Sequence, residues 1–141
     1  MKLLLTSGGV VNPSIHSALV ELLGKPISEC HALCVPTAQW GHPMCGPTSV
    51  RGFVAAEPEP DWQYLSGLGW ASLGVLELTA LPSIGAERWV PWVREADVLL
   101  VDGGDEVPYR RRTAHRVTPL CCRDAEGVVL VDRLAEQLYE L

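Results

Sequence analysis

The apolar run Val98-Leu-Leu-Val101, which leads into Asp102-Gly103-Gly104-Asp105, is the feature that most constrains the fold of this chain. Four consecutive apolar residues without alternation are typical of a strand that is buried on both faces of a parallel sheet. The glycines that follow allow a sharp turn into a loop. Open α/β sheets place their chemistry at the carboxyl ends of the strands, so this segment predicts both a fold class and the location of a site.

The composition is that of one folded domain covering residues 1–141. The chain is 48% hydrophobic and 20% charged, a balance typical of globular proteins. No apolar run reaches the roughly 18 residues that a membrane span requires. The apolar start of the chain runs directly into Gly8-Gly9 without a cleavage-type segment. We therefore expect a cytoplasmic protein with no membrane partner.

The charge and the cysteines argue against two further classes of protein. A net charge of −6 gives no overall field that favours nucleic acid, so we expect no nucleic-acid partner and a solvated surface at Arg110-Arg-Arg112. The cysteines are odd in number and irregularly spaced, which argues against a disulfide scaffold. They are Cys30, Cys34, Cys45, Cys121 and Cys122.

Strand patterns alternate with helical patterns along the chain. The expected strands are residues 2–7, 32–35, 73–78, 98–101 and 127–131, and the expected helices are 13–23, 61–68, 86–96 and 132–141. Asn12-Pro13 is a strong helix start, since Asn caps free N–H groups and Pro fits the first helical position. The helix at 86–96 is expected to present Trp89, Trp92 and Val93 to the sheet. The alternation predicts an α/β fold with a doubly wound, mainly parallel sheet.

Four segments of the chain show a family resemblance. They are Lys2-Leu-Leu-Leu-Thr-Ser-Gly-Gly9, Asn12-Pro13, Val35-Pro-Thr-Ala38 and Asp97-Val-Leu-Leu-Val-Asp-Gly-Gly-Asp105. They are similar to segments of the peptidase S51 family, which contains dipeptidase E and cyanophycinase. The resemblance covers residues 1–106 and leaves 107–141 as a divergent tail. It implies a flavodoxin-like fold related to class I glutamine amidotransferases, incomplete at its carboxyl end, and hydrolysis of small peptides.

The catalytic serine of that family has no counterpart in this chain. The resemblance implies a Gly-x-Ser-Ala-Gly elbow that presents the nucleophile, with a histidine and an acidic partner beyond it. No Gly-x-Ser-x-Gly occurs here, and the last serine is Ser83. No catalytic residue is therefore assigned. The resemblance does imply that the N–H groups of Gly103 and Gly104 line an oxyanion site, where such donors stabilise a tetrahedral intermediate.

A crevice at the strand ends is the predicted ligand site. Gly8 and Gly9, ahead of the helix start, form either a tight turn or a cradle of N–H groups for an anion. Thr37 follows the second strand, and Trp40 is the tryptophan most suited to face a ligand. Asp105 ends the loop after the fourth strand. The crevice candidates are thus Gly8, Gly9, Thr37, Trp40 and Asp105.

Two other groups of residues have the composition of a possible site. His31-x-x-Cys34 with His42-x-x-Cys45 offers four zinc ligands, but strand alternation points His31 and Cys34 to opposite faces. A neighbouring arginine could lower a thiol pKa at Cys121-Cys122. That pair lacks the flanking glycines of a nucleophile elbow. We therefore predict no metal and no cofactor, and thiols that are buried or incidental.

Two functions remain open from the sequence. One is an S51-like serine peptidase homologue that is catalytically incomplete. The other is a non-catalytic binding module or pseudoenzyme for a small anionic or peptide-like ligand. Loss of the elbow strand would also expose apolar surface and unpaired backbone groups at a sheet edge. We therefore expect a homodimer or poor solubility.

Overall fold

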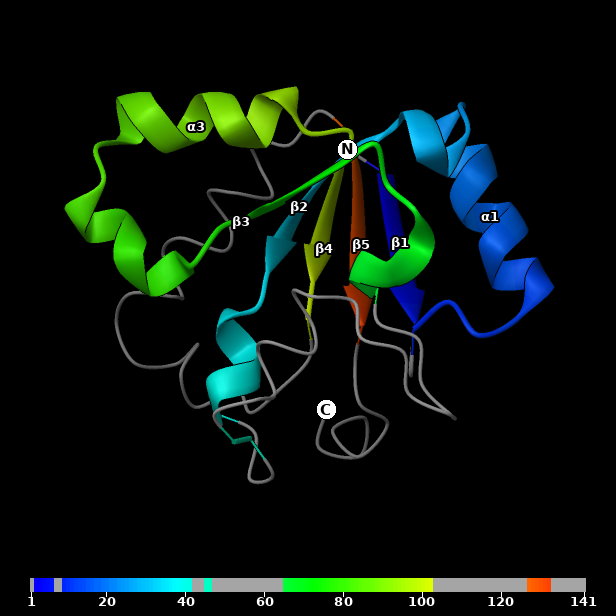
Figure 1. Ribbon diagram of the computed structural model, residues 1–141, viewed down its shortest axis with the longest axis horizontal. Helices are drawn as coiled ribbons and strands as arrows, with labels where there is room; N and C mark the ends of the chain where they lie inside the picture. The colour runs from blue at the N-terminus through cyan, green and yellow to red at the C-terminus, as the bar shows by residue number, and fades with distance from the viewer. Residues whose placement is uncertain (1, 7–8, 42–44, 47–64, 103–126, 133–141) are drawn as a thin grey trace.

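A five-stranded parallel sheet forms the centre of the described structure. The computed structural model describes residues 2–6, 9–41, 45–46, 65–102 and 127–132. The strands are β1 (Lys2–Thr6), β2 (His31–Val35), β3 (Ser72–Val75), β4 (Val98–Val101) and β5 (Val128–Asp132). They lie in the order β1-β5-β4-β2-β3, and every neighbouring pair is parallel (Figure 1). This confirms the predicted α/β class with a parallel sheet.

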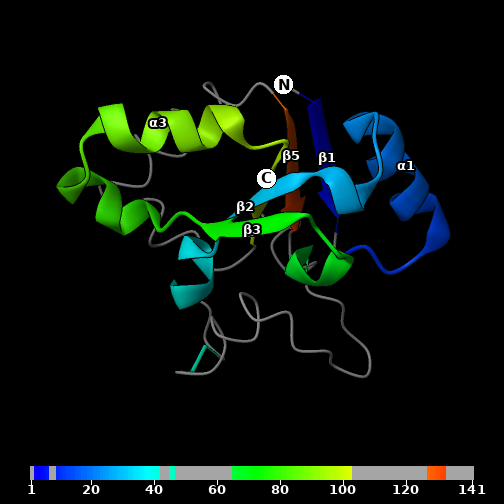
Figure 2. The same cartoon turned by 45° about the horizontal axis from the view of Figure 1, so that its top comes forward.

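Helices lie on both sides of this sheet. Figure 2 shows α1 (Pro13–Leu23) on one side of the strands and α3 (Ala86–Glu95) on the other. Short 3-10 turns connect the other elements. They are η1 (Ile27–Glu29), η2 (Thr37–Gly41), η3 (Leu65–Leu68) and η4 (Leu78–Ser83). Within the described segments, no helix has the length and apolar character needed to cross a membrane.

The helix α1 begins and ends where its local sequence predicts. The Asn12 side-chain oxygen accepts a hydrogen bond from the Ile15 N–H at 2.9 Å, which satisfies one of the free donors of the first turn. Gly24 adopts a left-handed φ of 73°, and its N–H donates to the Val20 carbonyl at 2.9 Å. Leu19 points from this helix into the core and is fully buried. The start, stop and buried face of α1 are therefore all confirmed.

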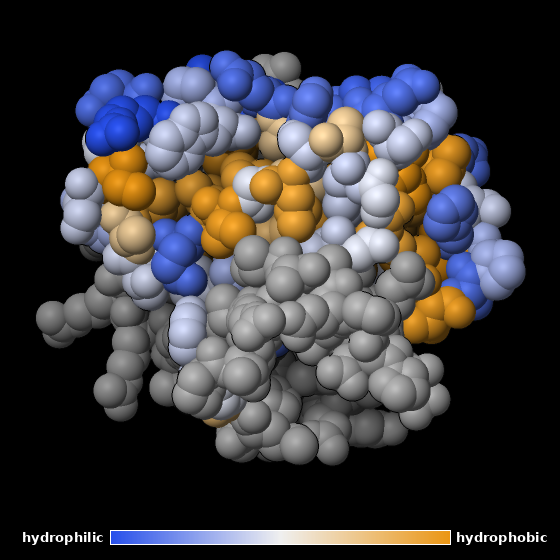
Figure 3. Space-filling model, in the orientation of Figure 1, coloured by the Kyte–Doolittle hydropathy of each residue, from blue (hydrophilic) through white to orange (hydrophobic). Residues whose placement is uncertain are grey.

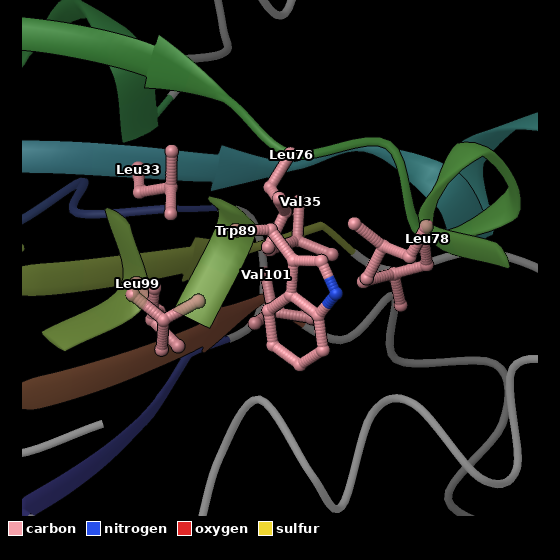
Figure 4. Packing of buried hydrophobic residues seen from close by; sticks show 9 residues of the cluster. Leu33, Val35, Leu76, Leu78, Trp89, Leu99 and Val101 are labelled. Atoms are coloured by element: carbon pink, nitrogen blue, oxygen red, sulfur yellow. The ribbon is translucent and has the colours of Figure 1, made fainter. Parts of the chain in front are cut away.

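Alternate residues of the central strands build two separate cores. Leu99 and Val101 of β4 pack with the α3 side, whereas Val98 and Leu100 pack with the α1 side. All four side chains are buried, as the uninterrupted apolar run predicts. Figure 4 shows the Trp89 indole of α3 among side chains of the first core. Burial of each large side chain stabilises the fold by roughly 1.5–3 kcal/mol.

Trp92 is not a core residue, contrary to the expectation from its spacing. Trp89 and Val93 are 7% and 0% exposed, whereas Trp92 is 42% exposed. At 100° per residue, Trp89 and Val93 lie 40° apart on the helix and Trp92 lies 100° from Val93, at the edge of the buried stripe. The helix therefore buries one tryptophan and leaves the other at the surface.

The third strand is shorter than predicted. It ends at Val75, and the expected strand residue Leu78 instead begins η4. Leu76 and Leu78 are both buried, so the apolar pattern predicted their burial correctly but not their backbone conformation. The Glu77 side chain accepts a hydrogen bond from the Thr79 N–H at 3.3 Å, which starts the turn. This capping contact ends the extended segment.

The carboxyl-terminal elements are described only in part. The expected strand 127–131 is present as β5, displaced by one residue, so Asp132 belongs to a strand and not to the expected helix. Residues 133–141 of that helix lie outside the described part of the chain. In the expected helix 61–68, residues 61–64 including Asp61 also lie outside it. The remainder of that segment forms the 3-10 turn η3.

Gly127 is required where β5 begins, because its backbone lies against the start of β4. A Cβ atom at this position would lie 2.2 Å from the Asp97 carbonyl oxygen. We expect Gly127→Ala to lower the free energy of unfolding by about 1–2 kcal/mol, since the backbone must shift to relieve the overlap. Urea denaturation measures this loss. Gly46→Ala is the control, because a Cβ there meets no atom within 4 Å. Equal stability of the two variants would contradict the close approach.

Candidate functional site

The direction of the chain connections changes between β2 and β4. The next strand after β2 is β3, on one side of it, whereas the next strand after β4 is β5, on the other side. The Asp102 N–H donates to the Val35 carbonyl at 3.2 Å, so the carboxyl ends of the two strands are joined directly. In open α/β sheets a ligand crevice lies outside the strand ends at such a switch point. The candidate site therefore lies at the exits of β2 and β4.

Thr37 is fixed at the exit of β2 by two hydrogen bonds. Its side chain is 1% exposed, its hydroxyl donates to Glu77 Oε1 at 2.6 Å, and the same oxygen accepts from the Leu78 N–H at 2.9 Å. These bonds join η2 to the segment after β3. Because the hydroxyl is buried and makes both of these hydrogen bonds, it holds η2 in place and does not act as a nucleophile.

The Glu77 carboxylate accepts hydrogen bonds from residues of both η2 and η4. In addition to Thr37, Oε1 accepts from the Thr79 hydroxyl at 3.0 Å, and Oε2 accepts from the Trp40 Nε1–H at 3.4 Å. The Trp40 side chain is 55% exposed, so its indole remains accessible. The site thus presents an aromatic surface beside a carboxylate of fixed orientation.

Gln39 adds an acceptor in the same turn as Thr37 and Trp40. Its N–H donates to the Pro36 carbonyl at 3.0 Å, which closes the turn. Its side-chain Oε1 is buried and has no hydrogen-bond partner among the described residues. An unsatisfied buried acceptor is costly in a folded protein, and a bound N–H donor removes that cost.

Cys34 lies in β2 below the site and is not a nucleophile. The side chain is fully buried in the core on the α1 side. Burial raises the pKa of its thiol to about 12, and the negative charge of Asp102 adds to the increase. The thiol is therefore protonated at neutral pH, and only a thiolate is an effective nucleophile. The predicted role of Cys34 as a core residue is confirmed.

The structure brings together only some of the predicted crevice residues. Thr37 and Trp40 meet at Glu77. Gly9, which is buried with φ of 83°, follows β1, and β5 and β4 separate that strand from β2. Three strand spacings correspond to roughly 14 Å, so Gly9 is not adjacent to Thr37. The other candidates lie outside the described residues: Gly8, Gly103, Gly104 and Asp105.

Glu77, Gln39 and Asp102 are site residues that the sequence did not identify as such. Glu77 was hidden because the apolar pattern around it predicted a strand over residues 73–78. The spacing Glu77-x-Thr79, in which a carboxylate can cap the N–H two residues later, is the signal that would have revealed it. Gln39 has no distinguishing sequence pattern.

The possible zinc ligands do not converge in the described structure. His31 is exposed at the start of β2, where its Nδ1 lies 2.7 Å from Ser72 Oγ, whereas Cys34 is buried. His42 lies outside the described residues. Across residues 2–6, 9–41, 45–46, 65–102 and 127–132, no three metal-binding side chains of His, Cys, Asp or Glu gather.

A cavity of about 320 Å³ lies at the opposite end of the sheet, between the carboxyl ends of α1 and α3. Lys2 and Asp97 contribute to its wall, and both have partners within the fold. The Lys2 ammonium donates to the Leu22 carbonyl at 2.6 Å, and the Asp97 carboxylate pairs with Lys25 at 2.9 Å. The charged groups here stabilise helix ends and strand starts, so the cavity is secondary to the switch point as a candidate site.

Asp97 makes the fold sensitive to acid. Partial burial alone would raise the pKa of the Asp97 carboxyl. Hydrogen bonds from Lys25 and from the His31 N–H, together with the positive charge of Lys25, lower the pKa by more than burial raises it. The pKa of Asp97 is therefore below the ordinary 3.8. Because the folded pKa is the lower one, this stabilisation is complete above pH 3.8 and is lost as the pH falls through the folded pKa.

We therefore expect Asp97→Asn to reduce the loss of stability that acid causes. Urea midpoints, measured from neutral pH to below 3.8, should fall less steeply in the variant than in the wild type. Glu87→Gln is the control, because this carboxyl of α3 is exposed and forms no ion pair with another described residue. Parallel curves for wild type and Asp97→Asn would contradict the role of the carboxylate.

The geometry of the switch point is suited to binding. A carboxylate, a second acidic residue, a buried acceptor and an exposed indole lie close to two joined strand ends, an arrangement that can hold a cationic or N–H-rich group. Comparison of the chain with family models, with curated proteins and with solved structures finds no match. The chemistry of these side chains is thus the basis on which a function is proposed.

Proposed function

We propose that this chain is a non-catalytic binding protein that holds a short peptide or peptide-like molecule at the carboxyl ends of β2 and β4. The single observation that supports this most directly is the Thr37–Glu77–Trp40 contact at the switch point between these strands. It provides an aromatic surface and a fixed carboxylate where α/β sheets bind their ligands. The cytoplasmic location expected from the sequence is part of this proposal.

The order of the described strands is related to the flavodoxin-like order by a circular permutation. That fold has the spatial order 2-1-3-4-5. Here the order, taken from the opposite edge, is β3-β2-β4-β5-β1. If β2 is numbered as the first strand, this order becomes 2-1-3-4-5. The strand β1 then takes the position of the fifth strand, at the edge of the sheet. The proposed relationship to the S51 peptidases and the class I amidotransferases therefore depends on the similar segments within residues 1–106 and not on the strand order.

The acidic groups favour a ligand with a free amino group. Glu77 lies beside the turn that follows β2, and an ammonium group at its carboxylate would gain a charge-assisted hydrogen bond. The Trp40 indole can add a cation–π contact. The buried Gln39 Oε1 can accept from a peptide N–H. A peptide-like ligand therefore fits these groups better than a simple anion does.

An S51-like hydrolase is the second candidate, and the sequence similarity of residues 1–106 favours it. Hydrolysis requires a nucleophile that an adjacent base activates. Thr37 is engaged in hydrogen bonds and Cys34 is protonated at neutral pH, so neither of these described residues serves that purpose. Binding without turnover is for this reason the proposed activity.

Calorimetric titration with dialanine, followed by chromatography of the mixture, separates the two candidates. We expect saturable binding with no release of free alanine. N-acetyl-dialanine, which lacks the cationic amino group, should bind about tenfold more weakly because it forfeits a charge-assisted hydrogen bond. Release of alanine would establish the hydrolase instead. Absence of binding by both peptides would contradict the peptide-binding proposal.

A further inference from the structure

A serine, a histidine and an aspartate lie in one row where the strands begin. Ser72 and His31 are the first residues of β3 and β2, and they are partners in the register of this parallel pair. Asp97 directly precedes β4, the neighbour of β2 on its other side, and its N–H donates to the His31 carbonyl at 2.9 Å. Because these strands run parallel, the row lies at the opposite end of the sheet from the candidate peptide site.

The Ser72 hydroxyl and the His31 imidazole are in direct contact. The Ser72 Oγ lies 2.7 Å from the His31 Nδ1, which is within the distance at which a base takes the proton of a nucleophile. Both residues are exposed, so a dissolved substrate can reach them. Figure 3 shows hydrophilic side chains along the upper edge of the molecule, where the strands of Figure 1 begin. The pair therefore combines a nucleophile, a base and access from water.

Asp97 fixes His31 and stabilises its charged form. The Asp97 Oδ2 accepts from the His31 N–H at 2.8 Å, and Oδ1 pairs with the Lys25 ammonium at 2.9 Å. Although burial raises the pKa of Asp97, the bonds from Lys25 and the His31 N–H lower it, and the charges of Lys25 and of the His31 ring lower it further. By the same attraction, the carboxylate favours the imidazolium that forms when His31 takes up a proton.

We propose that Ser72 is a nucleophilic serine that accepts an acyl group from activated esters, with His31 as its general base. The Ser72 Oγ attacks the carbonyl carbon of the ester while its proton passes to the His31 Nδ1. The C–O bond of the ester then breaks, the leaving group departs as an anion, and the imidazolium releases its proton to water. The acyl group remains on Ser72. An activated ester is the suitable donor because its leaving group is stable as an anion, whereas the amine of a peptide must be protonated as it leaves.

Incubation of the full chain with p-nitrophenyl acetate tests the proposal. We expect release of nitrophenolate and, in mass spectra of the peptides, an acetyl group on Ser72. His31→Gln retains a hydrogen-bonding side chain but not the base, so acylation of Ser72 should slow about a hundredfold. Asp97 is a positioning residue, and Asp97→Asn keeps an acceptor for the His31 N–H but loses the charge. Acylation at the same serine should therefore slow about fivefold in this variant.

Ser14→Ala is the matched control. Ser14 is also exposed, but its hydroxyl donates to the Asn12 Oδ1 at 2.8 Å, and an amide oxygen is not a general base. This variant should react at the rate of the wild type, and circular dichroism verifies that each variant folds. Acetyl groups confined to lysine side chains would overturn the proposal. Equal rates of Ser72 acylation in His31→Gln and in the wild type would overturn it as well.

The reaction at Ser72 is independent of peptide binding at the switch point. The two sites lie at opposite ends of the sheet, so Ser72→Ala should remove the fast release of nitrophenolate and leave the binding of dialanine unchanged. A fast release that persists in Ser72→Ala would show that another group of the chain is the nucleophile and would overturn the proposal.

Discussion

Replacement of Trp89 by alanine is expected to lower the free energy of unfolding by about 3–5 kcal/mol, the usual cost of removing a buried tryptophan. The Trp89 side chain is 7% exposed and packs in the α3-side core with Val35, Leu78 and Val101. The substitution removes the largest buried side chain of α3 and leaves a cavity that the rigid strands cannot close. Urea denaturation monitored by far-ultraviolet circular dichroism measures the loss.

Trp92→Ala is the matched control, since it removes the same side chain from the same helix. Trp92 is 42% exposed, so we expect a loss of less than about 1 kcal/mol. The ratio of the two effects tests the orientation of α3. Comparable losses for the two variants would show that the helix presents a different face to the sheet.

Replacement of Thr37 by valine is expected to cost about 3 kcal/mol and to weaken binding of dialanine. Valine keeps the shape of the side chain but leaves the buried Leu78 N–H without its acceptor and the Glu77 carboxylate without its shortest hydrogen bond. Loss of a bond to a charged group and an unsatisfied buried donor both contribute. Because Glu77 is then less well oriented, the dissociation constant of dialanine should rise about tenfold.

Thr79→Val distinguishes this effect from a general loss of hydroxyl groups. Thr79 also donates to Glu77 Oε1, at 3.0 Å, but it is exposed. Its replacement should cost less than about 1 kcal/mol, because water can take the place of the hydroxyl. Equal losses in the two variants would mean that Thr37 does not join η2 to the segment after β3.

Elements that depend on local signals were predictable from the sequence. The Asn12 cap and the Gly24 stop each act within a few residues, so both ends of α1 followed directly. The buried run of β4 was equally clear, because a strand covered on both faces needs apolar residues at every position. The position of Trp92 was not predictable, because it depends on which flank of α3 meets the sheet.

The candidate site was predictable only in outline. Its location at the strand ends followed from the fold class, and Thr37 and Trp40 were identified from their place after β2. Glu77, which joins them, follows β3, and only the strand order brings this segment beside η2. Gly9 was predicted to belong to the site, but it follows β1, and the strand order separates β1 from β2. Long-range topology, rather than residue type, decides both cases.

Backbone amide NMR during titration with dialanine is the most direct test of the central claim that the switch point binds a peptide-like ligand. The backbone resonances of Thr37, Gln39 and Asp102, and the indole N–H resonance of Trp40, should shift in a saturable manner. The variant Glu77→Gln should abolish these shifts. Its spectrum should keep the dispersion of a folded protein. Shifts that instead map to Lys2, Asp97 and Gly127 would place the ligand in the cavity at the opposite end of the sheet. That result, or a spectrum that dialanine does not change, would contradict the account.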